Sequence, residues 1–134
     1  MRFFLDKCLS PYQARALHAL CEMEGHEVVH LMEEFPRRNV PDEVWLPELA
    51  SRGDWIVVSG DMRIFKSRQL KQVWLDARLT TFFLGKGWMN QAFWEQAWWL
   101  VRWWPHILRQ ARLVERGTAL EVPAKPQGKF VLLR

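Results

Sequence analysis

The chain has 134 residues, of which 49% are apolar and 25% are charged, a balance that suits a folded domain and excludes a disordered one. Its formal net charge of +4 favours a polyanionic partner such as nucleic acid. No stretch approaches the roughly 20 apolar residues of a membrane-spanning helix, and the first residues are too poor in apolar side chains for a signal peptide. We therefore expect a soluble, cytoplasmic protein without a membrane partner.

Apolar runs and turn residues predict an alternation of strands and helices. In chain order, strands are expected over 2–5, 27–31, 55–59 and 80–84, with a final pair near 120–122 and 130–133. Helices are expected from Pro11, capped by Ser10, to a cap at Gly25, and then over 42–51, 64–77 and 90–112. A loop with Pro36 and Pro41 precedes the second helix, while Pro47 and Pro105 predict irregular turns inside the second and last helices.

This alternation predicts the fold class. Strands that alternate with helices form right-handed crossovers and a parallel sheet. We expect residues 1–134 to form a single α/β domain with three layers, α/β/α, around a short, mainly parallel sheet that ends in a C-terminal strand pair. Cys8 and Cys21 form neither a CxxC pair nor a zinc-binding spacing, so free thiols are expected.

Three acidic residues stand where functional groups gather in such folds. Asp6 follows the first strand, Asp61 follows the third, and Asp42 begins the helix that leads into the third strand. Carboxyl ends of parallel strands meet at one edge of the sheet. Crowded carboxylates repel one another, which raises their pKa values, and a hard cation such as Mg²⁺ or Mn²⁺ offsets that repulsion. The pattern predicts a metal site with Glu43 as a reserve ligand, where the ion activates water against a phosphate.

Other roles remain open for these residues. Asp42 follows a proline and serves equally well as a helix cap. Asp61 follows Gly60 and also suits a turn. Asp54 is expected to be a plain turn residue. His26 and His30 lie on or beside the second strand, where a core or edge histidine is expected more often than a metal ligand.

Five motifs follow one another in the first half of the chain: Phe4-Leu5-Asp6, Leu9-Ser10-Pro11, Gly25-His26-Glu27-Val28-Val29-His30, Pro41-Asp42-Glu43-Val44-Trp45 and Val57-Val58-Ser59-Gly60-Asp61. Together they resemble PIN-like domains, and they look closest to the compact branch related to virulence-associated protein C (VapC-type) toxins. The resemblance implies a PIN-like fold in which Asp6, Asp42 and Asp61 hold Mg²⁺ or Mn²⁺ for RNA hydrolysis. Many relatives carry Glu-Asn after the first acid, where this chain has Lys7-Cys8, and a second acid shortly after the third-strand Asp, where this chain has Met62-Arg63-Ile64.

Basic residues lie next to the acids in the sequence. Lys7 follows Asp6, and Arg63, Lys66 and Arg68 follow Asp61. Cations at these positions are expected to contact an RNA backbone, which would make affinity depend on salt. A solvated helix face is the alternative for each residue taken alone.

The last expected helix is rich in tryptophan, and the chain holds nine in all. A helical wheel puts the core face at Phe93, Ala97, Leu100, Trp104, Leu108 and Ala111. Trp98, Trp99 and Trp103 then fall outside it, as an exposed cluster that binds a partner protein or a second copy of the chain. Stacking on RNA bases, or burial under the C-terminal strands, are the alternatives.

The leading hypothesis is a Mg²⁺- or Mn²⁺-dependent endoribonuclease, the toxin of a type II toxin–antitoxin pair. Its partners would be RNA and an antitoxin, with a homodimer as a further expectation. Two other classes of function are open. A receiver-like signalling module would use Lys86 beside the acids, and a degenerate PIN-like domain would bind without cleaving.

Overall fold

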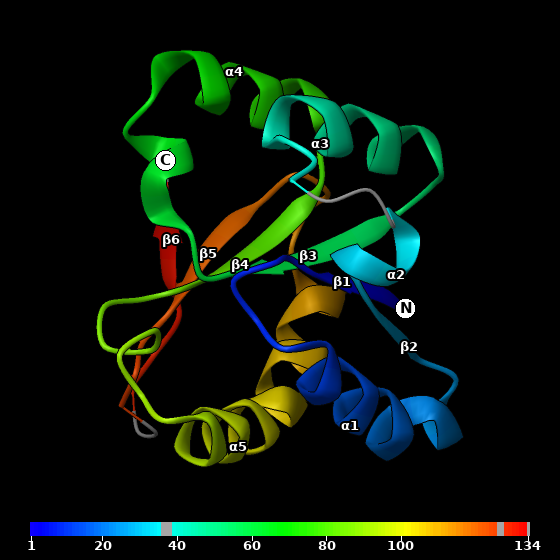
Figure 1. Ribbon diagram of the computed structural model, residues 1–134, viewed down its shortest axis with the longest axis vertical. Helices are drawn as coiled ribbons and strands as arrows, with labels where there is room; N and C mark the ends of the chain where they lie inside the picture. Colours follow the sequence, from blue (N-terminus) through cyan, green and yellow to red (C-terminus); the bar gives the residue numbers. More distant parts are fainter. Residues whose placement is uncertain (36–38, 126–127, 134) are drawn as a thin grey trace.

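The computed structural model describes residues 1–35, 39–125 and 128–133; Pro36 of the expected loop lies outside this range. A six-stranded sheet in the order β2-β1-β3-β4-β5-β6 forms the middle layer (Figure 1). The strands are β1 (Arg2–Leu5), β2 (Glu27–His30), β3 (Trp55–Ser59), β4 (Thr80–Leu84), β5 (Ala119–Val122) and β6 (Val131–Leu133). The helices are α1 (Pro11–Cys21), η1 (Glu22–Glu24), α2 (Leu31–Glu34), α3 (Asp42–Ser51), η2 (Met62–Phe65), α4 (Arg68–Ala77) and α5 (Phe93–Leu113).

The sheet is parallel from β2 to β5, and only β6 runs antiparallel, against β5. The register pairs Leu5 with Val58, Val58 with Phe82, and Phe82 with Leu120. Since these parallel strands end nearly level with one another, the residues that follow them gather along one edge of the sheet. The expected α/β fold with a C-terminal strand pair is therefore confirmed.

Helices cover both faces of the sheet, with α1 and α5 on one side and α3 and α4 on the other (Figure 1). Alternate strand residues serve the two faces. Phe3 and Leu5 pack in the core under α1 and α5, whereas Phe4 and Val57 pack in the core under α3 and α4. Strands of a parallel sheet that is buried on both faces are mostly apolar, and β1, β3 and β4 fit this rule, with Thr80 and Thr81 as buried polar residues of β4.

The helix expected over 64–77 is interrupted. The chain forms the short 3₁₀ helix η2 and then starts α4 afresh. Each start has its own cap, because the Asp61 side chain accepts from the amide of Arg63 and the Ser67 side chain accepts from the amide of Leu70. Two capping side chains in succession favour two helical segments over one.

The prolines do not end their helices. α3 begins at Asp42 and contains Pro47, and α5 continues past Pro105. α5 begins at Phe93, three residues later than expected from a start at Asn90. Both helices pack against the sheet, and tertiary packing offsets the hydrogen bond that each proline removes.

The helical wheel drawn for α5 is right about Leu100 and Trp104, which are buried, and wrong about Phe93 and Trp103. Trp103 is only 3% exposed, whereas Phe93, assigned to the core, is 45% exposed. Phe130 covers Trp103, with ring centroids 5.2 Å apart, so the segment before β6 adds a wall to that side of the helix. The buried residues of α5 are Gln96, Leu100, Trp103, Trp104 and Ile107.

Candidate active site at the carboxyl edge of the sheet

Asp6 is the most deeply buried of the three acids. Its amide continues the ladder by donating to the Val58 carbonyl over 3.2 Å. Its carboxylate accepts from the Cys8 amide over 2.9 Å through Oδ1, and from the Ser59 hydroxyl through Oδ2. The side chain is buried, so these hydrogen bonds replace the water that a carboxylate needs.

Ser59 joins Asp6 to Asp61. Besides donating to Asp6, its hydroxyl oxygen accepts from the Asp61 amide over 3.1 Å. One hydroxyl can donate once and accept twice, which makes this double role chemically sound. Sequence reasoning missed Ser59, although a lone hydroxyl residue closing an apolar strand before Gly60 and Asp61 was a signal for it.

Asp42 lies near the same edge of the sheet, on the side that α3 and α4 cover. It is the first residue of α3, and its Oδ1 accepts from the Trp45 indole nitrogen over 2.8 Å. Its negative charge is one of the causes that raise the pKa of Asp6, so the two carboxylates lie within electrostatic reach. An acid in the first turn stabilises a helix N-terminus, but the N-cap of α3 is Pro41 and no side-chain hydrogen bond caps it, so Asp42 is not the helix cap that the alternative assumed.

Asp61 forms an ion pair with Arg63. The Arg63 guanidinium donates from Nε to both carboxylate oxygens, over 2.8 and 3.0 Å, and from Nη2 to Oδ2 over 2.6 Å. The Arg63 amide donates to Oδ1 over 2.9 Å. Both Asp61 oxygens are thus occupied, while the Arg63 side chain itself is 74% exposed.

The two strand-end acids have opposite electrostatic environments. Burial is the main cause that raises the pKa of Asp6, with a further contribution from Asp42. Hydrogen bonds and charge from Arg63 lower the pKa of Asp61, and Lys7 adds to this effect. The expectation that crowding raises every carboxyl pKa is therefore wrong for Asp61. Burial and the charges of Asp6 and Asp61 also raise the pKa of the free Cys8 thiol to about 12.

A groove of about 450 Å³ opens beside these acids. Lys7, Arg63 and Lys66, three of the cations expected to contact RNA, line it together with Asp42 and Glu43. The fourth, Arg68, is exposed at the start of α4 and is not part of the lining. The structure therefore brings three expected phosphate contacts together beside the acids.

The described residues do not form a metal site as they stand. Over residues 1–35, 39–125 and 128–133, no three His, Cys, Asp or Glu side chains are grouped so that they could hold an ion. The carboxylate oxygens have the right chemistry for Mg²⁺ or Mn²⁺, but their arrangement does not fit an ion. The Arg63 guanidinium is hydrogen-bonded to Asp61, and the Trp45 indole is hydrogen-bonded to one oxygen of Asp42. The expected metal-bridging arrangement is thus absent from the part that the structure describes.

Two expectations about other residues have clear outcomes. Trp103 is buried, so it is wrong to count it with Trp98 as exposed; Trp98 is 51% exposed. Trp99 is partly buried and donates from its indole to Glu95 over 3.0 Å. His30 is a buried core residue, hydrogen-bonded to the Leu9 carbonyl over 2.6 Å.

The sheet order alone does not choose between families, since receiver domains share the order of the first five strands. Within the described residues, no helix has the length and apolarity to cross a membrane. No curated protein and no solved structure matches the chain. A family model described as a PIN-like domain matches residues 1–86, which contain all three acids and the cations beside them. The chain therefore belongs to the PIN-like domain family.

Proposed function

We propose that this protein is a Mg²⁺- or Mn²⁺-dependent endoribonuclease whose active site contains Asp6, Asp42 and Asp61. The observation that carries the proposal is the gathering of these acids beside a groove lined by Lys7, Arg63 and Lys66. PIN-like domains are often nucleases, and membership of that family supports the same reading.

The residues have distinct proposed roles. Asp6, oriented by Ser59 and by the Cys8 amide, provides a fixed carboxylate at the base of the site. Lys7 and Lys66 would bind the phosphates that flank the scissile bond, and the exposed Arg63 would contact a phosphate instead of Asp61. Asp6, Asp42 and Asp61 would then hold the cation, which would supply an activated water. Glu43 lines the groove next to Asp42 and stays in reserve as a ligand.

A single-stranded RNA labelled at one end tests this proposal. Cleavage is expected with Mn²⁺ or Mg²⁺ and not in EDTA, and Asp6→Asn or Asp61→Asn should lower the rate by at least about 100-fold. Asp54→Asn is the matched control, because Asp54 precedes β3 at the opposite edge and is exposed. Failure of every divalent cation to support cleavage, or full activity in both acid variants, would overturn the proposal.

A second candidate is an RNA-binding domain without nuclease activity. The ion pair between Arg63 and Asp61 favours it, because a permanent guanidinium on that carboxylate excludes a metal ion. Binding of RNA that is unchanged by EDTA, with no cleavage under any metal condition, would select this candidate.

We also propose that the nuclease is the toxin of a type II pair, bound by an antitoxin or by a second copy of the chain. The resemblance of the first half to VapC-type toxins supports this role. On the surface of α5, Trp94 and Trp98 are 82% and 51% exposed, which suits a protein interface. Induced expression in a bacterial host should arrest growth, and Asp61→Asn should abolish that arrest; harmless expression of active protein would contradict it.

A further inference from the structure

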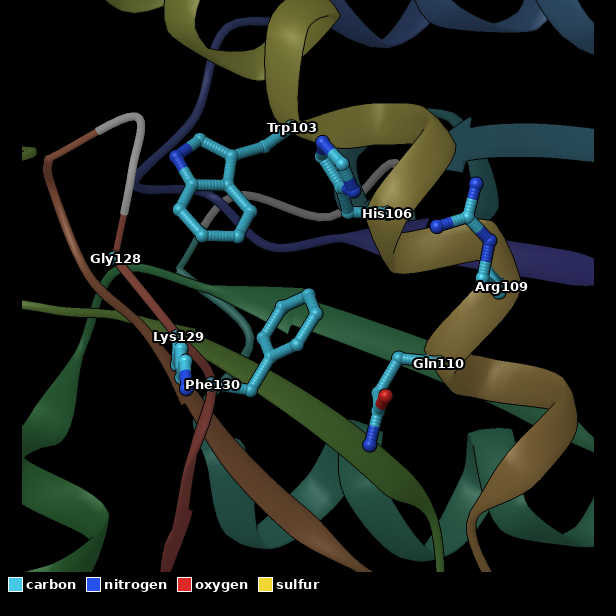
Figure 2. Close-up of a pocket in the computed structure, with 7 residues that line it drawn as sticks. All are labelled: Trp103, His106, Arg109, Gln110, Gly128, Lys129 and Phe130. Carbon is cyan, nitrogen blue, oxygen red and sulfur yellow. The ribbon is translucent and has the colours of Figure 1, made fainter.

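A second cavity lies on the other side of the sheet from the groove beside the acids. It occupies about 530 Å³ between α5 and the segment that leads into β6. Figure 2 shows Trp103, His106, Arg109 and Gln110 of α5 on one side of it and Gly128, Lys129 and Phe130 on the other. Its volume falls within the range of ordinary small-ligand sites, about 300–1,000 Å³.

The lining combines an aromatic surface with positive charge. The ring of Phe130, which is only partly buried, rests on Trp103 and Phe82, with centroids 5.2 and 5.5 Å away. Arg109 and Lys129 also line the cavity, and among the described residues no carboxylate does. Such a surface suits a ligand with a flat ring and a negative charge, the chemistry of a nucleotide.

The cations of this cavity have no anionic partner of their own. Within the described residues, neither Arg109 nor Lys129 forms an ion pair, although seven other pairs are present. His106 adds a third basic side chain, packed edge-on against Trp103 with centroids 5.7 Å apart. The charge is therefore available to a ligand.

Strand register places one wall of the cavity on the same edge as the acids. Ser59 is level with Phe83, Phe83 with Glu121, and Glu121 with Val131. Lys129 therefore precedes β6 at the end of the sheet where Asp61 follows β3. The two strands are three spacings apart, about 14 Å. Because the cavity and the groove lie on opposite faces of the sheet, an RNA in contact with both passes round this edge, and its path is longer than the roughly four stacked nucleotides, at about 3.4 Å each, that about 14 Å alone would need.

We propose that this cavity binds one nucleotide of a single-stranded RNA whose neighbouring segment lies in the groove beside the acids. The base stacks on Phe130, and the phosphates contact Arg109 and Lys129. The inference rests on the proposed function in one respect, that RNA is the ligand, and it does not depend on cleavage.

Binding of a short fluorescent oligoribonucleotide, measured by anisotropy in EDTA over a range of salt concentrations, tests this site. Lys129→Ala and Arg109→Ala should each weaken binding and reduce the salt slope, d log K/d log[salt], by about 0.7. Phe130→Leu, which keeps an apolar side chain in place, should weaken binding by about fivefold or more. Arg102→Ala is the matched control, since Arg102 lies on α5 over the Trp98 ring and outside the cavity.

Each outcome decides one question. Wild-type binding by Lys129→Ala and Arg109→Ala, or an equal loss in Arg102→Ala, would overturn the site. Binding of a free nucleoside 5′-monophosphate that requires Arg109 and Lys129, together with RNA binding that neither this nucleotide nor these substitutions change, would assign the cavity to a free nucleotide instead and overturn it as an RNA contact. If the variants bind RNA weakly but the wild type cleaves nothing, this inference stands and the proposed function fails.

Discussion

Replacing Arg63 with glutamine should tighten the binding of Mn²⁺ to this protein. Arg63 holds both oxygens of Asp61 through contacts of 2.6 to 3.0 Å, so a cation can reach that carboxylate only when the guanidinium leaves. Glutamine has no charge and makes no comparable pair. The variant should therefore leave Asp61 open to a metal ion, at the cost of one contact to RNA.

The size of the effect follows from Coulomb's law. If the displaced guanidinium stayed about 5 Å from an ion at Asp61, its repulsion of a doubly charged ion in water would change the affinity roughly tenfold. We expect the Kd for Mn²⁺ to fall by on the order of tenfold in Arg63→Gln. Half-saturation of any cleavage activity should move to lower Mn²⁺ by a similar factor.

Isothermal titration of the metal-free protein with Mn²⁺ measures this directly. Arg68→Gln is the matched control, since it removes the same charge from an exposed residue outside the groove. Asp61→Asn should bind Mn²⁺ more weakly than the wild type. Equal Kd values in Arg63→Gln and the wild type would refute the idea that Arg63 competes with the metal. An equally lowered Kd in Arg68→Gln would show that the effect comes from net charge alone and not from the contact between Arg63 and Asp61.

Three further predictions concern stability. Asp6→Asn should stabilise the fold at pH 7, because Asp6, whose pKa is raised in the folded protein, contributes stability only below its unfolded pKa of about 3.8 and loses this contribution as pH rises through the folded pKa. Asp61→Asn should destabilise the fold at pH 7, because Asp61, whose pKa is lowered, contributes stability above about 3.8 and loses it as pH falls through the folded pKa. Urea unfolding at pH 7 and pH 3 checks both signs, and equal shifts in the two variants would contradict them. Trp103→Ala should lower the free energy of unfolding by about 3–5 kcal/mol. Trp98→Ala should change it by less than about 1 kcal/mol and should weaken self-association or partner binding in sedimentation runs. A reversed ranking of the two free energies would make Trp98 the core residue. Ser10→Ala removes the cap of α1 and should cost about 1 kcal/mol by thermal unfolding, with Ser51→Ala, exposed at the end of α3, as the neutral comparison.

The sheet and the position of the acids could be predicted from the sequence because both follow from local patterns. Short apolar runs bounded by glycine and polar residues define β1, β3 and β4, and the rule for parallel strands places Asp6 and Asp61 at one edge. The two caps at Asp61 and Ser67 carried a readable signal as well, although the expected helix over 64–77 ignored it.

Two features could not be predicted from the sequence, for physical reasons. α5 carries apolar side chains on nearly all sides, so periodicity did not decide that Trp103 rather than Phe93 faces inward; the segment before β6, far along the chain, decides it. The ion pair of Asp61 depends on the conformation of the long Arg63 side chain, and the spacing of residues in the sequence does not specify a side-chain conformation.

The sheet ends at β6, and that ending has a practical consequence. β6 has three residues, and two of them, Val131 and Leu132, are exposed apolar side chains. This short antiparallel strand shields the edge of β5, whose own side chains are largely buried. Shortening the chain before residue 131 would leave a longer apolar edge open to pairing with other molecules. Truncated forms should therefore precipitate before they unfold.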